Sequence, residues 1–163
     1  KGATYLLSRA IERFQARHEG PMLTTAGELF ARLTCGAYDG LAIDHGDGEV
    51  PRLVGRRRGT GAEVPIRGMS EGTADQLYLA LRLAYLTEWV AHHEPLPLIV
   101  DDVLIKFDDD RAAATLEVLA DFSDRTQVVL FTHHEHLLEL IDERLGKSGR
   151  GRVFVSRLGE STG

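Results

Sequence analysis

The chain of 163 residues is poor in cysteine and in net positive charge. Its single cysteine, Cys35, excludes an internal disulfide and fits a reducing cytosol, so we expect a cytoplasmic protein. The net charge of -6 gives no general attraction to nucleic acid or to anionic membranes. Long apolar runs and a signal-peptide pattern are also missing, which predicts no membrane partner. A hydrophobic content of 43% is nevertheless enough for a globular domain with a core.

The N-terminal part of the sequence is helical in pattern. The chain begins with Lys1 rather than Met and enters this pattern directly, which favours a segment of a longer protein. Apolar residues recur at helical spacing over residues 3–18, opposite arginine and glutamate side chains. Gly20-Pro21 ends that helix, and residues 25–33 predict a second one.

The next segment is rich in glycine, aspartate and arginine. Residues 41–43 and 52–54 are predicted to pair as a hairpin, and residues 56–68 are predicted to form a mobile loop. The segment gathers five basic side chains, namely Arg52, Arg56, Arg57, Arg58 and Arg67. Such a cluster suits either contact with phosphates or a solvated loop, and both interpretations stay open.

The rest of the chain alternates between helical and strand patterns. Helices are predicted at residues 70–92, 109–122 and 135–145, and strands at residues 98–100, 127–131 and 152–158. The first of these helices is apolar nearly all round, which is typical of a buried helix. The alternation predicts an α/β fold, mainly a parallel sheet with covering helices.

Two carboxylates follow the first of these strands. Asp101 and Asp102 come directly after Leu98-Ile99-Val100, and ligands of open α/β sheets bind at the carboxyl ends of strands. Adjacent residues of a strand point to opposite faces, so the two carboxylates have different roles. One can hold Mg²⁺ and the other can polarise a water molecule. An ordinary strand-to-turn junction is an equally good interpretation of the pair alone.

A serine and a glycine precede the long helix. Ser70 is placed to cap its N-terminus, and Gly72 permits close approach of a ligand to the backbone. The N–H groups of a helix N-terminus suit an anion such as a terminal phosphate. Glu71 lies between the two residues and opposes this, and the tetrapeptide alone favours a simple cap.

Three histidines, His133, His134 and His136, follow the strand at residues 127–131. They are either exposed histidines at a strand end, a contact from His133 to a γ-phosphate, or a metal site built with Asp101 and Asp102.

A phosphate-binding loop is missing from the sequence. Gly146-Lys147-Ser148 imitates its end, but position 141 is Ile141 rather than glycine, and a helix rather than a strand precedes it.

In this order, the motifs from Met69 to His136 resemble the C-terminal ATPase half of the SMC and SbcC branch of the ABC ATPases, and above all the YhaN-like AAA-family ATPases. Met69-Ser70-Glu71-Gly72 resembles the signature motif, and Leu98 to Asp102 resembles the Walker B strand. Phe107-Asp108-Asp109 resembles the D-loop, and Phe131-Thr132-His133 resembles the strand of the switch histidine. The fold implied is one lobe of a P-loop NTPase head of the ABC type.

The resemblance also implies roles for individual residues. Asp101 would be the metal-side carboxylate for Mg²⁺, Asp102 would stand at the general base, and His133 would sense the γ-phosphate. Ser70 and Gly72 would contact ATP held by the opposite subunit, with Asp108 beside the nucleotide across the dimer interface. The sequence departs from the common pattern at Glu71, where glycine is frequent, and at Asp102, where glutamate is usual.

The resemblance further implies domains and partners. Residues 1–34 would be the end of a coiled coil and a helix leading into the head, and residues 35–163 the C-terminal lobe. The partners implied are the N-terminal Walker A half of the same protein, a second head, DNA, and a metallophosphoesterase nuclease. The function implied is ATP hydrolysis on dimerisation, in DNA repair or chromosome maintenance, with this segment inactive alone.

Two alternatives belong to other classes of protein. One is a metal-dependent hydrolase that uses Asp101, Asp102, His133, His134 and His136. The other is a non-catalytic interaction domain whose motifs are vestigial. A transition metal bound without nucleotide would favour the hydrolase, and ATP binding without hydrolysis in the full-length protein would favour the interaction domain.

Overall fold

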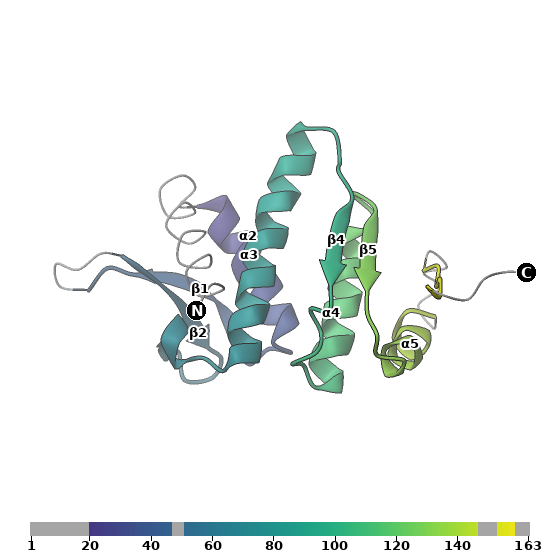
Figure 1. Ribbon diagram of the computed structural model, residues 1–163. Coiled ribbons are helices and arrows are strands. Elements are labelled where there is room, and N and C mark those ends of the chain that lie inside the picture. The colour runs from purple at the N-terminus through teal and green to yellow at the C-terminus, as the bar shows by residue number, and fades with distance from the viewer. Residues whose placement is uncertain (1–19, 47–50, 147–152, 159–163) are drawn as a thin grey trace, which may run out of the picture.

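The computed structural model describes residues 20–46, 51–146 and 153–158. The predicted helix at residues 3–18 lies outside them, so the predicted coiled coil is a matter of sequence alone. The described part contains helices and two small sheets (Figure 1). In chain order its elements are α2 (Pro21–Leu33), β1 (Tyr38–Asp44), β2 (Arg52–Arg57), β3 (Glu63–Pro65), the short helix η2 (Ile66–Gly68), α3 (Glu71–His92), β4 (Leu98–Asp101), α4 (Asp109–Phe122), β5 (Val128–Phe131), α5 (His136–Ile141) and the π-helical turn η3 (Asp142–Gly146).

The α/β class is confirmed, but the prediction of a mainly parallel sheet is wrong. The larger sheet is antiparallel, with the strand order β1-β2-β3, and only β4 and β5 pair in parallel. The predicted hairpin is confirmed, since Ala42 pairs with Val54 and Ile43 with Leu53. The prediction of a mainly parallel sheet fails because β2 continues through Arg57 and pairs with β3. The hairpin thereby becomes part of a three-stranded antiparallel sheet.

Two further predictions are wrong because strand formation depends on a neighbouring strand edge. The segment at residues 56–68 is not a loop throughout, because β3 pairs with β2 and η2 follows it. The strand predicted at residues 152–158 is not formed over residues 153–158, where Phe154 and Leu158 are highly exposed. Strand formation depends on a partner edge, which composition does not reveal.

The main core lies between α2, α3, the first sheet and α4. Phe30 and Leu33 of α2 and Leu77 of α3 are fully buried, and Phe30 packs against the ring of Tyr38 with centroids 4.9 Å apart. The buried amide of Gln76 donates a hydrogen bond to the backbone carbonyl of Leu33, which joins the end of α2 to α3. Within the described residues, no helix has the length and hydrophobicity needed to cross a bilayer.

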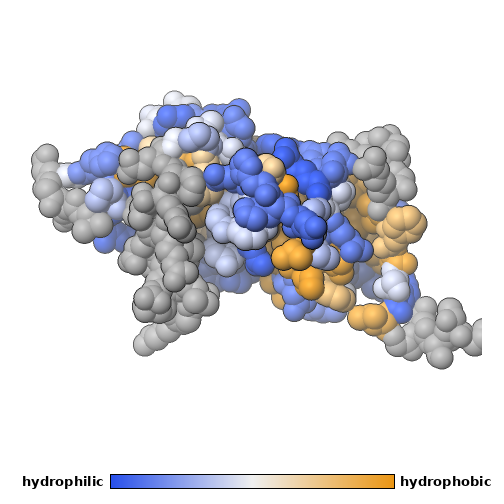
Figure 2. All heavy atoms as spheres, turned by 90° about the horizontal axis from the view of Figure 1, so that it is seen from above, coloured by the Kyte–Doolittle hydropathy of each residue, from blue (hydrophilic) through white to orange (hydrophobic). Residues whose placement is uncertain are grey.

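The β4–β5 sheet is covered on one face only within the described residues. Leu98 and Val100 are buried, whereas Ile99 is 58% exposed and Phe131 is 42% exposed. Seen from above, a mostly hydrophilic surface is interrupted by hydrophobic side chains on this half of the molecule (Figure 2). Within the described residues, one face of this sheet is therefore buried and the other is open to solvent.

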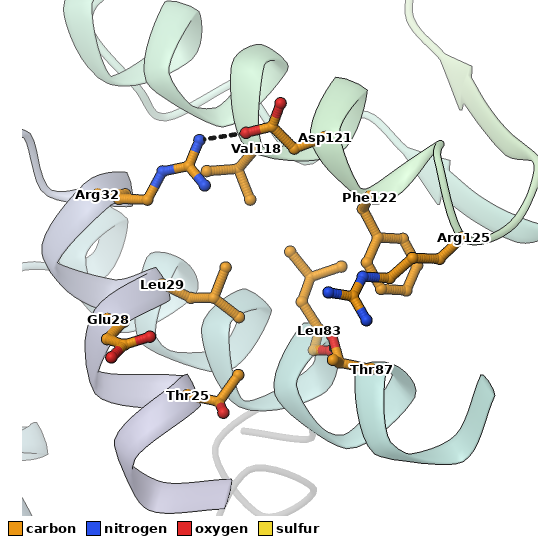
Figure 3. Close-up of a pocket in the computed structure, with 10 residues that line it drawn as sticks. All are labelled: Thr25, Glu28, Leu29, Arg32, Leu83, Thr87, Val118, Asp121, Phe122 and Arg125. Atoms are coloured by element: carbon orange, nitrogen blue, oxygen red, sulfur yellow. Dashed lines mark hydrogen bonds and ion pairs between the residues drawn. The ribbon is translucent and has the colours of Figure 1, made fainter. Parts of the chain in front are cut away.

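A hollow of about 190 Å³ lies between α2, α3 and α4, and Figure 3 shows the residues that line it. Arg32 and Asp121 form an ion pair of 2.6 Å on one side of it, and Arg125 lies on the other side. The hollow is beside the C-terminal end of α4, about 20 Å along that helix from its N-terminus. It is therefore remote from the carboxyl ends of β4 and β5, where the sequence motifs converge.

Candidate functional site

The motifs singled out in the sequence meet at one edge of the molecule. In Figure 1, β4 and β5 point toward the lower part of the molecule, where the N-termini of α3 and α4 lie. The parallel register places Asp101 opposite Phe131, so the next residues of both strands emerge side by side. This arrangement is the strand-end edge at which α/β sheets bind ligands.

Asp102 links the carboxyl ends of β4 and β5 through its backbone and its side chain. Its backbone N–H donates to the carbonyl of Phe131 at 3.0 Å, which extends the strand pairing by one residue. Its φ of 50° lies in the left-handed region, which is uncommon for an aspartate. Its Oδ2 then lies 2.8 Å from Nδ1 of His133, and its Oδ1 lies 3.4 Å from the hydroxyl of Thr132.

Asp101, the last residue of β4, has a different environment. Its side chain is exposed, and within the described part of the chain it has no hydrogen bond or ion pair. An exposed carboxylate with free oxygen atoms suits a hard cation such as Mg²⁺. The donor set therefore fits the predicted role of this residue.

The serine-glycine turn is a helix cap with a packed glycine. The Ser70 hydroxyl oxygen accepts a hydrogen bond from the N–H of Thr73 at 3.2 Å, as an N-cap should. A Cβ atom on Gly72 would lie 3.1 Å from the carbonyl oxygen of Lys106. The absence of a side chain at Gly72 thus lets the backbone of the loop after β4 pack closely against the first turn of α3.

Lys106 is a site-edge residue that sequence reasoning missed. Its Nζ lies 3.1 Å from Asp75 and 3.5 Å from Glu71, so it connects the loop after β4 to the first turn of α3. The hydrogen bond and charge of Asp75, with a smaller contribution from Glu71, raise the pKa of Lys106. A lone lysine in a loop carries no sequence signal that would have identified this link.

Asp108 caps α4 by accepting a hydrogen bond from the N–H of Arg111 at 3.0 Å.

Of the three histidines, only His133 and His134 lie close to the carboxylate of Asp102. His134 lies against His133 with ring centroids 4.0 Å apart, whereas His136 turns away to Asp109, 3.0 Å from its carboxylate. The five-residue metal centre of the alternative hydrolase is therefore reduced to Asp102, His133 and His134.

Comparison with known structures defines the class of fold. A structure from a study of ATP-driven dimerisation and DNA-stimulated activation of SMC ATPases matches 83% of this chain and 78% of its own, with a TM-score of 0.59 and 17% identity. The SMC head domain from Thermotoga maritima matches 82% of this chain and 44% of its own, with a TM-score of 0.53 and 17% identity. The chain has the fold of an SMC head lobe.

The sequence comparison identifies a particular relative. YhaN of Bacillus subtilis (strain 168) is 34% identical over 133 residues, which are 81% of this chain and 13% of YhaN. The chain is thus a partial homologue of YhaN and spans about an eighth of its length. No protein-family model matches the sequence. The resemblance inferred from the motifs is confirmed.

Proposed function

We propose that this chain is the C-terminal part of an ABC-type ATPase head that hydrolyses ATP when two heads dimerise. The observation that carries the proposal is the convergence of three motif residues at one sheet edge. Asp102 contacts His133 directly, and Asp101 precedes it with a free carboxylate. The shared fold with SMC heads gives this edge a matching context.

In the proposed reaction, Asp102 holds the attacking water and accepts its proton as the water oxygen bonds to the γ-phosphorus. The bond from that phosphorus to the bridging oxygen breaks, and ADP leaves with that oxygen. His133 orients this carboxylate through Nδ1 and presents its other nitrogen toward the terminal phosphate. Asp101 would hold Mg²⁺, which neutralises charge that develops on the phosphate oxygens. Asp102 is one methylene shorter than the usual glutamate, and its left-handed backbone changes the direction in which its carboxylate is presented.

Ser70 and Gly72 serve a nucleotide bound by the second head in this proposal. The Ser70 side chain is exposed at the N-terminus of a 22-residue helix, where N–H groups and the helix dipole favour an anion. Asp108, at the N-terminus of α4, lies beside the same interface. One chain therefore contributes to two nucleotide sites and completes neither.

The missing phosphate-binding loop would come from the N-terminal Walker A half of the same protein. Ile99 and Phe131 support this, because their exposed apolar side chains leave a face of the β4–β5 sheet available for packing. In line with this, the 163-residue chain alone should neither bind ATP tightly nor hydrolyse it.

DNA is the proposed target of the complete protein, in repair or chromosome maintenance, with a metallophosphoesterase nuclease as a further partner. The arginines of β2 and its loop are the candidate contacts. Arg56 is engaged by Asp39 at 2.6 Å, and Arg57 lies over the ring of Tyr38, which leaves Arg58 and Arg67 as better candidates. Arg58→Ala with Arg67→Ala should weaken DNA binding and flatten its dependence on salt.

The test of the ATPase proposal is steady-state ATP turnover by the complete protein. Asp102→Asn should reduce turnover at least about 100-fold, since a positioned general base contributes ~10²–10⁴-fold. Asp124→Asn is the matched control, because this exposed aspartate lies in the turn between α4 and β5, at the opposite end of the sheet. Equal turnover in both variants would refute the role of Asp102.

A further inference from the structure

The carboxylate and the two histidines at the strand ends form a compact cluster of potential metal ligands. One carboxylate oxygen of Asp102 and one imidazole nitrogen from each of His133 and His134 lie within 4.8 Å of one another. It is the only such cluster found within the described residues. We propose that, when no nucleotide is bound, these three residues bind a divalent transition-metal ion such as Zn²⁺.

The spacing of the donor atoms suits such an ion. Tetrahedral Zn²⁺ with ligand bonds of about 2.0–2.2 Å places neighbouring ligand atoms roughly 3.3–3.6 Å apart. Asp102 and His133 are now 2.8 Å apart, as a directly bonded pair, and must separate by less than an ångström. The side chain of His133 is 67% exposed, which gives its ring room to rotate.

His134 provides an independent observation. Its Nε2 atom is shielded from solvent and has no hydrogen-bonding partner among the described residues. A shielded imidazole nitrogen without a partner is unfavourable, because it loses hydration and gains nothing in exchange. Coordination of a metal ion through this nitrogen would provide the partner that is lacking.

Thr132 holds two of the ligand residues in place. Its hydroxyl oxygen accepts a hydrogen bond from the backbone N–H of His134 at 3.2 Å and lies 3.4 Å from Oδ1 of Asp102. Such contacts to ligand residues orient metal sites and commonly affect their affinity. The cluster is thus supported by its own strand-end backbone.

The chemistry of the donors selects the metal. Two imidazoles and one carboxylate favour Zn²⁺ and related first-row ions, whereas Mg²⁺ prefers oxygen ligands and water. Asp101 remains available to Mg²⁺ because it is outside the cluster. Three protein ligands leave a fourth position for water or for an anionic oxygen.

The binding test does not depend on the proposed ATPase function, because it uses the 163-residue chain without nucleotide. The chain is purified without a histidine tag, stripped with chelator, and titrated with Zn²⁺ by calorimetry. A single high-affinity equivalent is expected. Circular dichroism of each variant confirms that the fold is retained.

A second histidine pair in this chain provides a matched control. His92 and His93 are also adjacent and exposed, and His93 stacks on Trp89 rather than facing a carboxylate. His133→Ala with His134→Ala should weaken Zn²⁺ binding at least about 100-fold, since loss of an outer-shell partner alone costs ~10–100-fold. His92→Ala with His93→Ala should leave the affinity within about twofold of the wild type.

Co²⁺ absorption supplies a second readout. Bound Co²⁺ should show visible bands of a nitrogen and oxygen site, without the near-ultraviolet band of a thiolate from Cys35. The single variant His134→Ala should lose these bands while retaining its circular dichroism spectrum. Equal weakening by both histidine pairs, or unchanged bands in His134→Ala, would overturn the proposed site.

Discussion

Nδ1 of His133, two residues beyond the end of β5, lies 2.8 Å from Oδ2 of Asp102, one residue beyond the end of β4. The two residues are 31 positions apart in sequence and meet only because the strands are parallel and in register. We therefore expect the two residues to act as one functional unit. Removal of either side chain should abolish the contribution of the other to ATP turnover.

A double-mutant cycle in the complete protein tests this unit. His133→Ala and Asp102→Asn should each lower kcat for ATP at least about 100-fold. The double variant should be little worse than either single variant, because residues that act together are non-additive.

The chain contains a matched control for this cycle in the pair His136 and Asp109. These residues are 3.0 Å apart and exposed, and they have the same chemistry. His136→Ala should change kcat less than about twofold, as expected for a surface pair of little energetic weight. Additive losses in the Asp102 cycle, or an equal loss in His136→Ala, would contradict the account.

Substitutions of Ser70 should separate helix capping from nucleotide contact. Ser70→Ala should lower the free energy of unfolding by about 1 kcal/mol, whereas Ser70→Asp should preserve it, because aspartate caps as well as serine. Both variants should lose ATP-dependent dimerisation of the complete protein. Alanine lacks the hydroxyl that would contact the phosphate, and aspartate repels the phosphate. Chemical denaturation and sedimentation measure the two properties. A Ser70→Asp protein that dimerises normally with ATP would exclude the phosphate contact.

The bridge from Lys106 to Glu71 predicts how this chain accommodates an acidic residue in its signature-like turn. Lys106→Ala should weaken ATP-dependent dimerisation by no more than about fivefold, because an exposed ion pair contributes little. In a Glu71→Gly background the same substitution should have less effect, because the carboxylate that Lys106 offsets is gone. The measurement is the dimer dissociation constant of the wild type, of each single variant and of the double variant. If Lys106→Ala weakens dimerisation by the same factor with Glu71 present and in the Glu71→Gly background, Lys106 does not offset the charge of Glu71.

Cys35 gives a prediction of pH dependence. Partial burial, followed by the charges of Asp108 and Asp110, raises the pKa of this thiol above its ordinary value of 9.0. The folded state thus holds the proton more tightly, and this contribution to stability is present below pH 9.0 and is lost as the pH rises through the folded-state pKa.

The corresponding experiment is the rate of iodoacetamide labelling at pH 8.5 in the folded chain and in urea. The folded chain should react more slowly per accessible thiol, because less of it is thiolate. Asp110→Asn should speed the reaction of the folded chain and leave the rate in urea unchanged. A folded thiol that reacts as fast as the unfolded one would show that its pKa is not raised.

Local patterns predicted the elements that carry strong periodicity. The helix after Ser70, the helix at residues 109–122 and the pairing of residues 41–43 with 52–54 all follow from spacing, caps and turn residues. The parallel β4–β5 pair was likewise expected from the alternation of strands and helices. These features depend on neighbours in sequence, which is why they can be read from it.

Features that depend on distant partners could not be predicted in this way. β3 has three residues and no clear alternation, and it forms because β2 offers an edge. The contact of Lys106 with Glu71 and the separation of His134 from His136 depend on how the loops pack. The roles of Ser70, Gly72, Asp101, Asp102, Asp108 and His133 remain predictions.

Mixing two inactive variants of the complete protein tests most directly whether one chain serves two nucleotide sites. A Ser70→Asp protein keeps Asp102, and an Asp102→Asn protein keeps Ser70. If these residues act on nucleotides of different subunits, each mixed dimer that forms regains one intact site, and an equimolar mixture should recover up to about one quarter of wild-type ATP turnover. Turnover no higher than the mean of the two separate variants would contradict the account.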